Sequence, residues 1–172
     1  SMADFTSYSP PGASIAESYV HIVRTPPYQK SWFCGPLLGT ARGALESYLQ
    51  QTKARTGRIL GESIVLQVPV QVRVGAAVAN LDTVDMIFTD LMRRLHVLGA
   101  AREEIRGEEL LRMRRLMTLA SKLCVETADS LSGMMGITGF ATVNPVQRFY
   151  RDCRTVSMHV ELNWDHTMSA TG

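Results

Sequence analysis

The stretch VPVQVRVGAAVANLDTVDMIFTDLMRRLHVL, Val68 to Leu98, decides between two fold classes. Its first residues alternate valine with other residues, as a half-buried strand does, but apolar residues then recur at spacings of three and four up to its end. A run of this length without a breaker is typical of a helix, and Pro69 suits the first turn of one. The stretch therefore predicts one long amphipathic helix in an all-α fold.

Two further helices are predicted on either side of this stretch. Apolar residues recur at helical spacing from about Pro36 to Ala54, and again after Gly107. Residues 1–30 differ, because they hold four of the seven prolines and show no helical period. We expect a loop or tail there.

A fourth helix is predicted to begin at Asn144-Pro145 and to run on without interruption. Asn144 is a good N-cap, Pro145 fits the first helical position, and Gln147 can reach back as the partner of a capping box. At 100° per residue, one face is apolar and predicted to be buried, and a narrower polar stripe lies beside it. The apolar face contains Val146, Phe149, Tyr150, Cys153, Val156, Val160 and Trp164. The polar stripe contains Arg148, Asp152, Thr155, His159, Asn163 and His166. Four amphipathic helices with short connections predict an antiparallel four-helix bundle.

Composition narrows the possible partners and compartments. A hydrophobic content of 45%, a charged content of 20% and a net charge of +2 describe an ordinary globular protein, with no reason to expect nucleic acid or an acidic membrane as partner. No apolar run approaches the ~20 residues that span a bilayer, and residues 1–30 lack a signal-peptide pattern, so we expect a cytoplasmic protein. Cys34, Cys124 and Cys153 are widely spaced and odd in number, so neither a disulfide framework nor a metal site is predicted.

A glycine-rich turn precedes the predicted fourth helix. Gly133, Gly136 and Gly139 allow positive φ and a close approach of the backbone, which suits a phosphate or a ribose. A helix-to-helix turn needs glycine for the same reason. The pattern leaves both interpretations open.

Three segments carry a resemblance to a known family. GITGFATVNPVQRFYRD, residues 136–152, resembles the final-domain signature of the acyl-CoA dehydrogenase superfamily. RFYRDCRTVSMHVELNWD, residues 148–165, is similar to its branch of two-component flavin-dependent monooxygenases, and LLGTARGALESYLQQTKART, residues 37–56, resembles the first helix of the same domain. The resemblance implies that residues 31–172 are a C-terminal four-helix bundle, and that residues 1–30 are a linker or tail at the end of a missing β-domain.

The resemblance also implies a function and its site residues. Members of this branch hydroxylate aromatic or polycyclic substrates with O2 and a reduced flavin, FAD or FMN, which a separate flavin reductase supplies. His159 matches a histidine that assists by hydrogen bonding or proton removal. Gly136, Gly139, Arg151 and Asp152 match the turn and the Arg-Asp pair expected to contact the flavin. The family assembles as a homodimer or homotetramer through this domain, and the chain by itself is expected to show no turnover.

Other functions stay open beside this one. An acyl-CoA dehydrogenase needs a carboxylate base, and in many relatives it stands where this sequence has Val160, while Glu161 lies about 100° further round the predicted helix. A non-catalytic helical domain that serves only assembly is a third possibility, in which His159 is a structural residue. The identity of the substrate is not encoded in these segments.

Overall fold

The computed structural model describes residues 15, 26–53, 55–57, 61, 63–103 and 105–171, with the side chains of residues 26–30 excepted. The α-helices are α1 (Pro26–Thr52), α2 (Val68–Ala100), α3 (Gly107–Met134), α4 (Pro145–Ser157) and α5 (Trp164–Thr171). Short 3-10 segments lie in three of the connections: η3 (Ile64–Leu66), η4 (Gly136–Phe140) and η5 (Val160–Leu162). The described residues form no strand, so the all-α prediction is confirmed.

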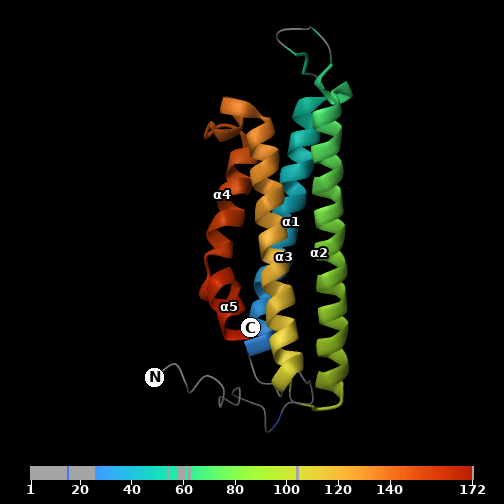
Figure 1. Ribbon diagram of the computed structural model, residues 1–172, viewed down its shortest axis with the longest axis vertical. Helices are drawn as coiled ribbons and strands as arrows, with labels where there is room; N and C mark the ends of the chain where they lie inside the picture. The colour runs from blue at the N-terminus through green and yellow to red at the C-terminus, as the bar shows by residue number, and fades with distance from the viewer. Residues whose placement is uncertain are drawn as a thin grey trace.

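The helices lie side by side as an elongated bundle, with α4 and α5 end to end along one edge (Figure 1). The expected fourth helix is therefore divided into two, and the described residues contain five α-helices rather than four. α3 is the central element, because it packs against α1, α2, α4 and α5.

α1 begins ten residues before the expected start at Pro36, so residues 26–30 are helical. Pro36 lies inside this helix on its exposed side, and Trp32, one turn earlier, is also exposed. The carbonyl that a proline leaves without its helical partner therefore faces water, where it can be solvated. The division into a tail at residues 1–30 and a bundle at 31–172 stays a prediction.

α2 confirms the helical interpretation of the alternating valines. Pro69 occupies its first turn, and Val70 and Val74 pack against the core. The face turned towards the bundle is buried at Ala77, Leu81, Val84, Leu91, Leu95 and Gly99. The alternating valines are therefore the first turns of a longer helix and not a strand.

The core runs the length of the bundle in two clusters. The larger joins α1, α3 and α4 with the first half of α2 and includes Tyr48, Leu131 and Val146. The smaller lies against the second half of α2 and contains Leu91, Leu95, Cys34, Met113 and Met117. No described helix is both long enough and apolar enough to cross a membrane.

Candidate functional site

α4 begins at a cap that also ties it to α1. The side-chain oxygen of Asn144 accepts a hydrogen bond from the backbone N–H of Val146 at 2.9 Å, and Pro145 occupies the first helical position, as expected. The predicted capping box does not form around the backbone N–H of Asn144, which donates to the carbonyl of Ala141 at 2.8 Å. The Asn144 amide pairs instead with that of Gln51 on α1, through hydrogen bonds of 3.1 and 3.2 Å in opposite directions.

α4 ends at Ser157, so the continuous polar stripe that the sequence predicted is wrong. The backbone tightens into a turn where Met158 N donates to Thr155 O and His159 N to Val156 O. A new helix then starts at Asn163, whose side-chain oxygen accepts from the backbone N–H of His166 at 2.9 Å. We call residues Met158–Asn163 the break.

The break lets residues within it and beyond it pack onto α3. Leu162 and Thr167 are buried, and the Thr167 hydroxyl lies 3.1 Å from that of Thr118 on α3. The prediction that Val160 and Trp164 are buried is wrong, because the break changes the phase of the apolar face: they are 44% and 39% exposed. The rest of that face is buried at Val146 and Cys153 and half-buried at Phe149, Tyr150 and Val156.

His159 lies in the break with its side chain exposed but held from two directions. Its Nδ1 accepts a hydrogen bond from the backbone N–H of Glu161 at 3.3 Å, so the imidazole caps the turn η5. Its ring also contacts the ring of Phe33 on α1, with centroids 4.3 Å apart and an angle of 31° between the planes. The Phe33 contact could not be read from the sequence, because it joins residues more than a hundred positions apart.

The glycine turn lies at the other end of α4 from His159. α4 has 13 residues, which corresponds to about 20 Å at ~1.5 Å per residue. Gly136 adopts φ of +64°, and a Cβ there would meet open space. Gly139 is buried, and a Cβ there would overlap the backbone carbonyl of Ser132 and lie 2.6 Å from Cβ of Met135. Gly136 thus provides a left-handed turn, whereas Gly139 is required by packing against the end of α3.

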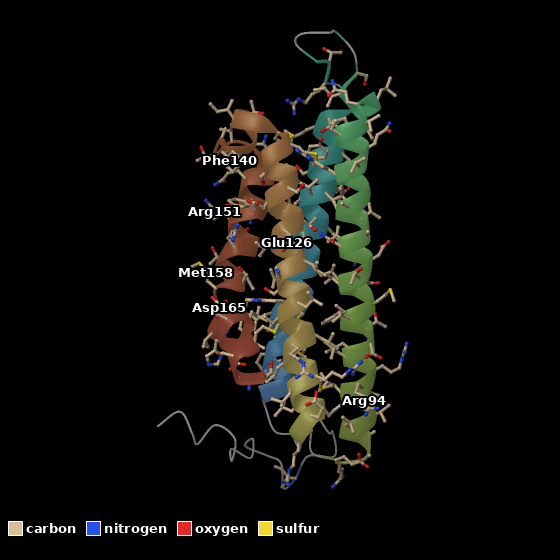
Figure 2. The ribbon with its side chains drawn as sticks, viewed as in Figure 1. Arg94, Glu126, Phe140, Arg151, Met158 and Asp165 are labelled. Carbon is tan, nitrogen blue, oxygen red and sulfur yellow. The ribbon has the colours of Figure 1, made fainter. Side chains whose placement is uncertain are left out.

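Arg151 and Asp152 lie between these two ends. Asp152 lies 3.5 Å from Arg148 and 3.9 Å from Arg151, measured between the guanidinium nitrogen and the carboxylate oxygen. Both arginine side chains are well exposed, at 75% and 60%. Figure 2 shows Phe140, Arg151, Met158 and Asp165 following one another down the outer edge formed by α4 and α5. The predicted flavin contacts are therefore spread along this edge rather than gathered at one point.

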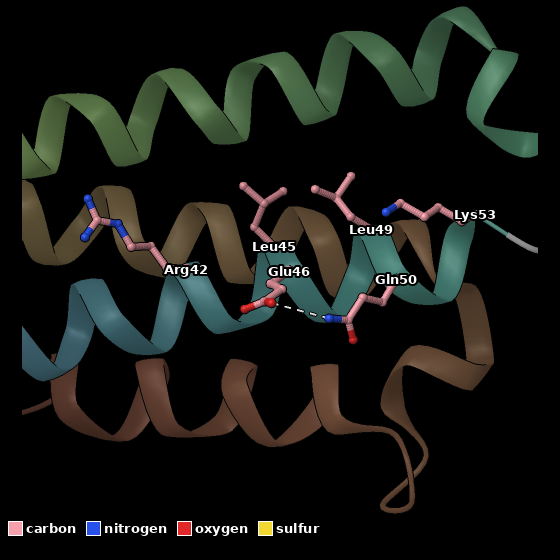
Figure 3. A pocket seen from close by; sticks show the side chains of 6 residues that line it. All are labelled: Arg42, Leu45, Glu46, Leu49, Gln50 and Lys53. Carbon is pink, nitrogen blue, oxygen red and sulfur yellow. Dashed lines mark hydrogen bonds between the residues drawn. The ribbon is translucent and has the colours of Figure 1, made fainter.

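Two hollows lie on the surface of the bundle. One, of about 360 Å³, separates α3 from the break and is lined by Met158, Leu162 and Asn163 but not by His159. Its mouth carries Lys122 over the ring of Trp164, 4.3 Å from the centroid. The other, of about 420 Å³, follows the outer side of α1, which lies between α2 and α4 (Figure 3). It is lined by Arg42, Leu45, Glu46, Leu49, Gln50 and Lys53.

Cys34, Cys124 and Cys153 are buried, and within the described part of the chain no cluster of His, Cys, Asp and Glu has the arrangement of a metal site. Burial, reinforced by the neighbouring thiols of Cys153 and Cys34, raises the pKa of Cys124 from 9.0 to about 12. Burial, reinforced by Asp152, raises the pKa of Cys153 from 9.0 to about 12. These thiols remain protonated at neutral pH and are poor nucleophiles.

The sequence is similar to those of characterised proteins. A FADH(2)-dependent resorcinol hydroxylase oxygenase component from Rhizobium sp. is 31% identical over 136 residues, which is 74% of this chain and 33% of that protein. The oxygenase component of p-hydroxyphenylacetate 3-hydroxylase from Acinetobacter baumannii is 23% identical over 139 residues, 81% of this chain and 33% of that one. The chain thus spans about a third of the length of these curated relatives.

Solved structures show the same fold. XiaF from Streptomyces sp., in complex with FADH2 and glycerol, superposes with a TM-score of 0.82 at 20% identity over 100% of this chain and 42% of its own. The HsaA monooxygenase from M. tuberculosis gives 0.79 at 20% identity over 99% of this chain and 44% of its own. The family model described as acyl-CoA dehydrogenase, C-terminal domain, matches residues 31–164. The chain belongs to the acyl-CoA dehydrogenase C-terminal domain family.

Proposed function

We propose that this chain is the C-terminal helical domain of a flavin-dependent monooxygenase that hydroxylates an aromatic or polycyclic substrate with reduced flavin and O2. The observation that carries the proposal is His159: an imidazole held at a helix break, exposed on one side and fixed on two others. The position that follows it is Val160, which has no carboxylate to remove an α-proton, so dehydrogenation of an acyl-CoA is not supported.

The residues along α4 fit a flavin. Arg151 and Arg148 offer exposed guanidinium groups for a phosphate, and Asp152 between them limits where each can move. Gly136 leaves bare backbone at the turn, and Gly139 gives that turn its shape. These features do not distinguish FAD from FMN. When bound, the reduced flavin would supply the activation of O2, while this chain binds, orients and donates hydrogen bonds. A separate flavin reductase would supply the reduced flavin.

The test compares His159→Ala with His166→Ala in the intact protein that carries this chain, with reduced flavin supplied. We expect His159→Ala to lower product formation by ~10²–10⁴-fold, the usual effect of losing one proton-transfer or hydrogen-bonding group, with the melting temperature little changed. His166, exposed on α5, is the control and should retain the wild-type rate. Equal hydroxylation rates in wild type and His159→Ala would remove His159 from the site.

We also propose that the protein self-associates through the outer face of α2. Seven residues without charge follow one another along this face: Val68, Val72, Gly75, Ala76, Ala79, Thr83 and Met86. Val72 and Met86 are 64% and 73% exposed. In an antiparallel pair of α2 helices with its two-fold axis at Ala79, Val72 of one copy lies opposite Met86 of the other. Because the seven residues carry no charge, no like charges meet along this face, so a second copy fits.

Light scattering on the chain tests this contact. We expect an oligomer in the wild type and a monomer of 19.0 kDa in Ala79→Glu, because two carboxylates would meet at the axis. Ser130→Glu, which places the same charge on the exposed side of α3, is the control. A wild-type chain that stays monomeric at high concentration would contradict the proposal.

A cytoplasmic location belongs to the same proposal. Cys124 and Cys153 are buried free thiols, which fits a reducing compartment.

A further inference from the structure

The two ring nitrogens of His159 have different surroundings. Nδ1 lies 3.3 Å from the backbone nitrogen of Glu161 and accepts a hydrogen bond from its N–H. A neutral imidazole carries a hydrogen on one nitrogen and a lone pair on the other, so the nitrogen that accepts cannot be the one that is protonated. The hydrogen of neutral His159 is therefore on Nε2.

The ring plane is fixed as well as the tautomer. Phe33 is half-buried and packs against the larger core cluster, so its own position on α1 is well determined. Its ring contacts that of His159 with 4.3 Å between centroids. An exposed side chain ordinarily samples several rotamers, and a tilted ring contact at this distance restricts both of its torsion angles.

We propose that Phe33 and the Glu161 backbone N–H are positioning groups that hold His159 as an Nε2–H hydrogen-bond donor towards an oxygen or ring-nitrogen acceptor of the bound flavin or substrate. This inference rests on the proposed function and deepens it, since a histidine at this place can either donate a hydrogen bond or remove a proton. To act as a base, the neutral ring needs a free lone pair. Nε2 already carries a hydrogen, and the lone pair of Nδ1 is occupied by the Glu161 N–H.

The tautomer is measured in the chain itself, without flavin. Long-range ¹H–¹⁵N spectra in alkaline buffer, where histidine side chains are neutral, distinguish a protonated from an unprotonated ring nitrogen. We expect His159 to be almost wholly the Nε2–H form, whereas His166 shows the ordinary mixture. Glu161→Pro removes the N–H and should move His159 towards the values of His166. A predominant Nδ1–H form, or no difference between His159 and His166, overturns the assignment.

The Phe33 contact has its own readout, which requires no variant at position 161. A neighbouring aromatic ring shifts the carbon-bound proton signals of the His159 ring upfield. We expect Phe33→Tyr to keep this shift and Phe33→Leu to lose it, with His166 unaffected in both. Unchanged His159 signals in Phe33→Leu would show that the two rings do not meet in solution.

Activity in the intact protein separates donation from proton removal. A glutamine amide can place an N–H near the position of Nε2 but cannot accept a proton at neutral pH. We expect His159→Gln to stay within ~10-fold of the wild-type hydroxylation rate, while His159→Ala loses ~10²-fold or more. If glutamine is no better than alanine, donation is wrong and proton removal stands. If both variants keep the wild-type rate, it is the proposed function of this site that fails.

Phe33 is tested in the same assay as a residue that acts through His159. We expect Phe33→Leu to lower kcat and to raise the fraction of reduced flavin that O2 reoxidises with release of hydrogen peroxide instead of hydroxylated product. The KM for flavin should be unchanged, and Phe33→Tyr should keep the wild-type behaviour. A lower melting temperature with an unchanged ratio of product to peroxide would show that Phe33 is only a packing residue.

Discussion

Gly139→Ala tests whether this glycine is present for packing or for a ligand. Gly139 is buried in η4, directly over the last turn of α3. An alanine Cβ would overlap the carbonyl oxygen of Ser132 and lie 2.6 Å from Cβ of Met135. Neither atom is at the end of a flexible side chain, so η4 or the end of α3 must move.

The expected loss follows from two opposing terms. Overpacking of this kind costs ~1–3 kcal/mol, and the smaller conformational entropy of alanine in the unfolded chain offsets ~0.4–1 kcal/mol. Mid-range values leave a net loss of ~1–2 kcal/mol in the free energy of unfolding. At ~2–4 °C per kcal/mol for a domain of this size, the melting temperature should fall by about 2–8 °C. Gly39→Ala is the control, because Gly39 is exposed within α1 and a Cβ there would meet nothing within 4 Å. That variant should gain ~0.5–1 kcal/mol from helix propensity.

Thermal and urea unfolding of the chain, followed by circular dichroism at 222 nm, measures both variants. The two substitutions should shift the midpoint in opposite directions. If Gly139→Ala is as stable as the wild type while Gly39→Ala is stabilised, packing does not explain Gly139. Close approach of the Gly139 backbone to the flavin is then the remaining reason for a glycine at that position.

Two further predictions concern the thiols and the cap of α4. Cys124 and Cys153, with thiol pKa values raised to about 12, should be unreactive towards a thiol reagent at pH 8 and react once urea unfolds the chain. Because unfolded thiols ionise near pH 9, the free energy of unfolding should fall as the pH rises from about 9 towards 12, as a pH series of urea titrations would show. Asn144→Ala should lower the free energy of unfolding by ~1–2 kcal/mol. Asn144→Ser should lower it less, because serine keeps the cap and loses only the hydrogen bonds to Gln51. A double-mutant cycle with Gln51→Ala isolates that pair, and zero coupling would contradict it.

The sequence predicted the long helices well because their apolar spacing is set by burial against neighbours. α2 is the clearest example, since a helical period from Ala77 to Leu95 outweighs a few alternating valines. The start of α1 could not be predicted in the same way. Local rules put Pro26 and Pro27 in a tail and Pro36 at the start of the helix, whereas the structure places Pro36 inside α1, on its outer side, where its missing donor costs little.

The site residues named from the sequence stay a prediction, whereas the single helix expected to carry them is divided in the structure. The apolar period continues through Val156, Val160 and Trp164 with no proline or glycine to interrupt it, so the pattern indicated one helix. Contacts of Leu162 and Thr167 with α3 are long-range and leave no local trace. One local signal was present: Asn163 followed by Asp165 is a typical helix start, a capping residue with an acid in the first turn.

Because the break separates α5 from α4, the last helix depends on its contacts with α3 for its stability. An isolated helix of eight residues is too short to persist in water, where ~12–15 residues are marginal. α5 is kept helical by α3, through the Thr118–Thr167 hydroxyls, Lys122 over Trp164 and the guanidinium of Arg115 on the carbonyl of Thr171. α3 therefore acts as a template on which the final segment folds, and any change that loosens it is felt at the loop that carries His159, without altering a residue of that loop.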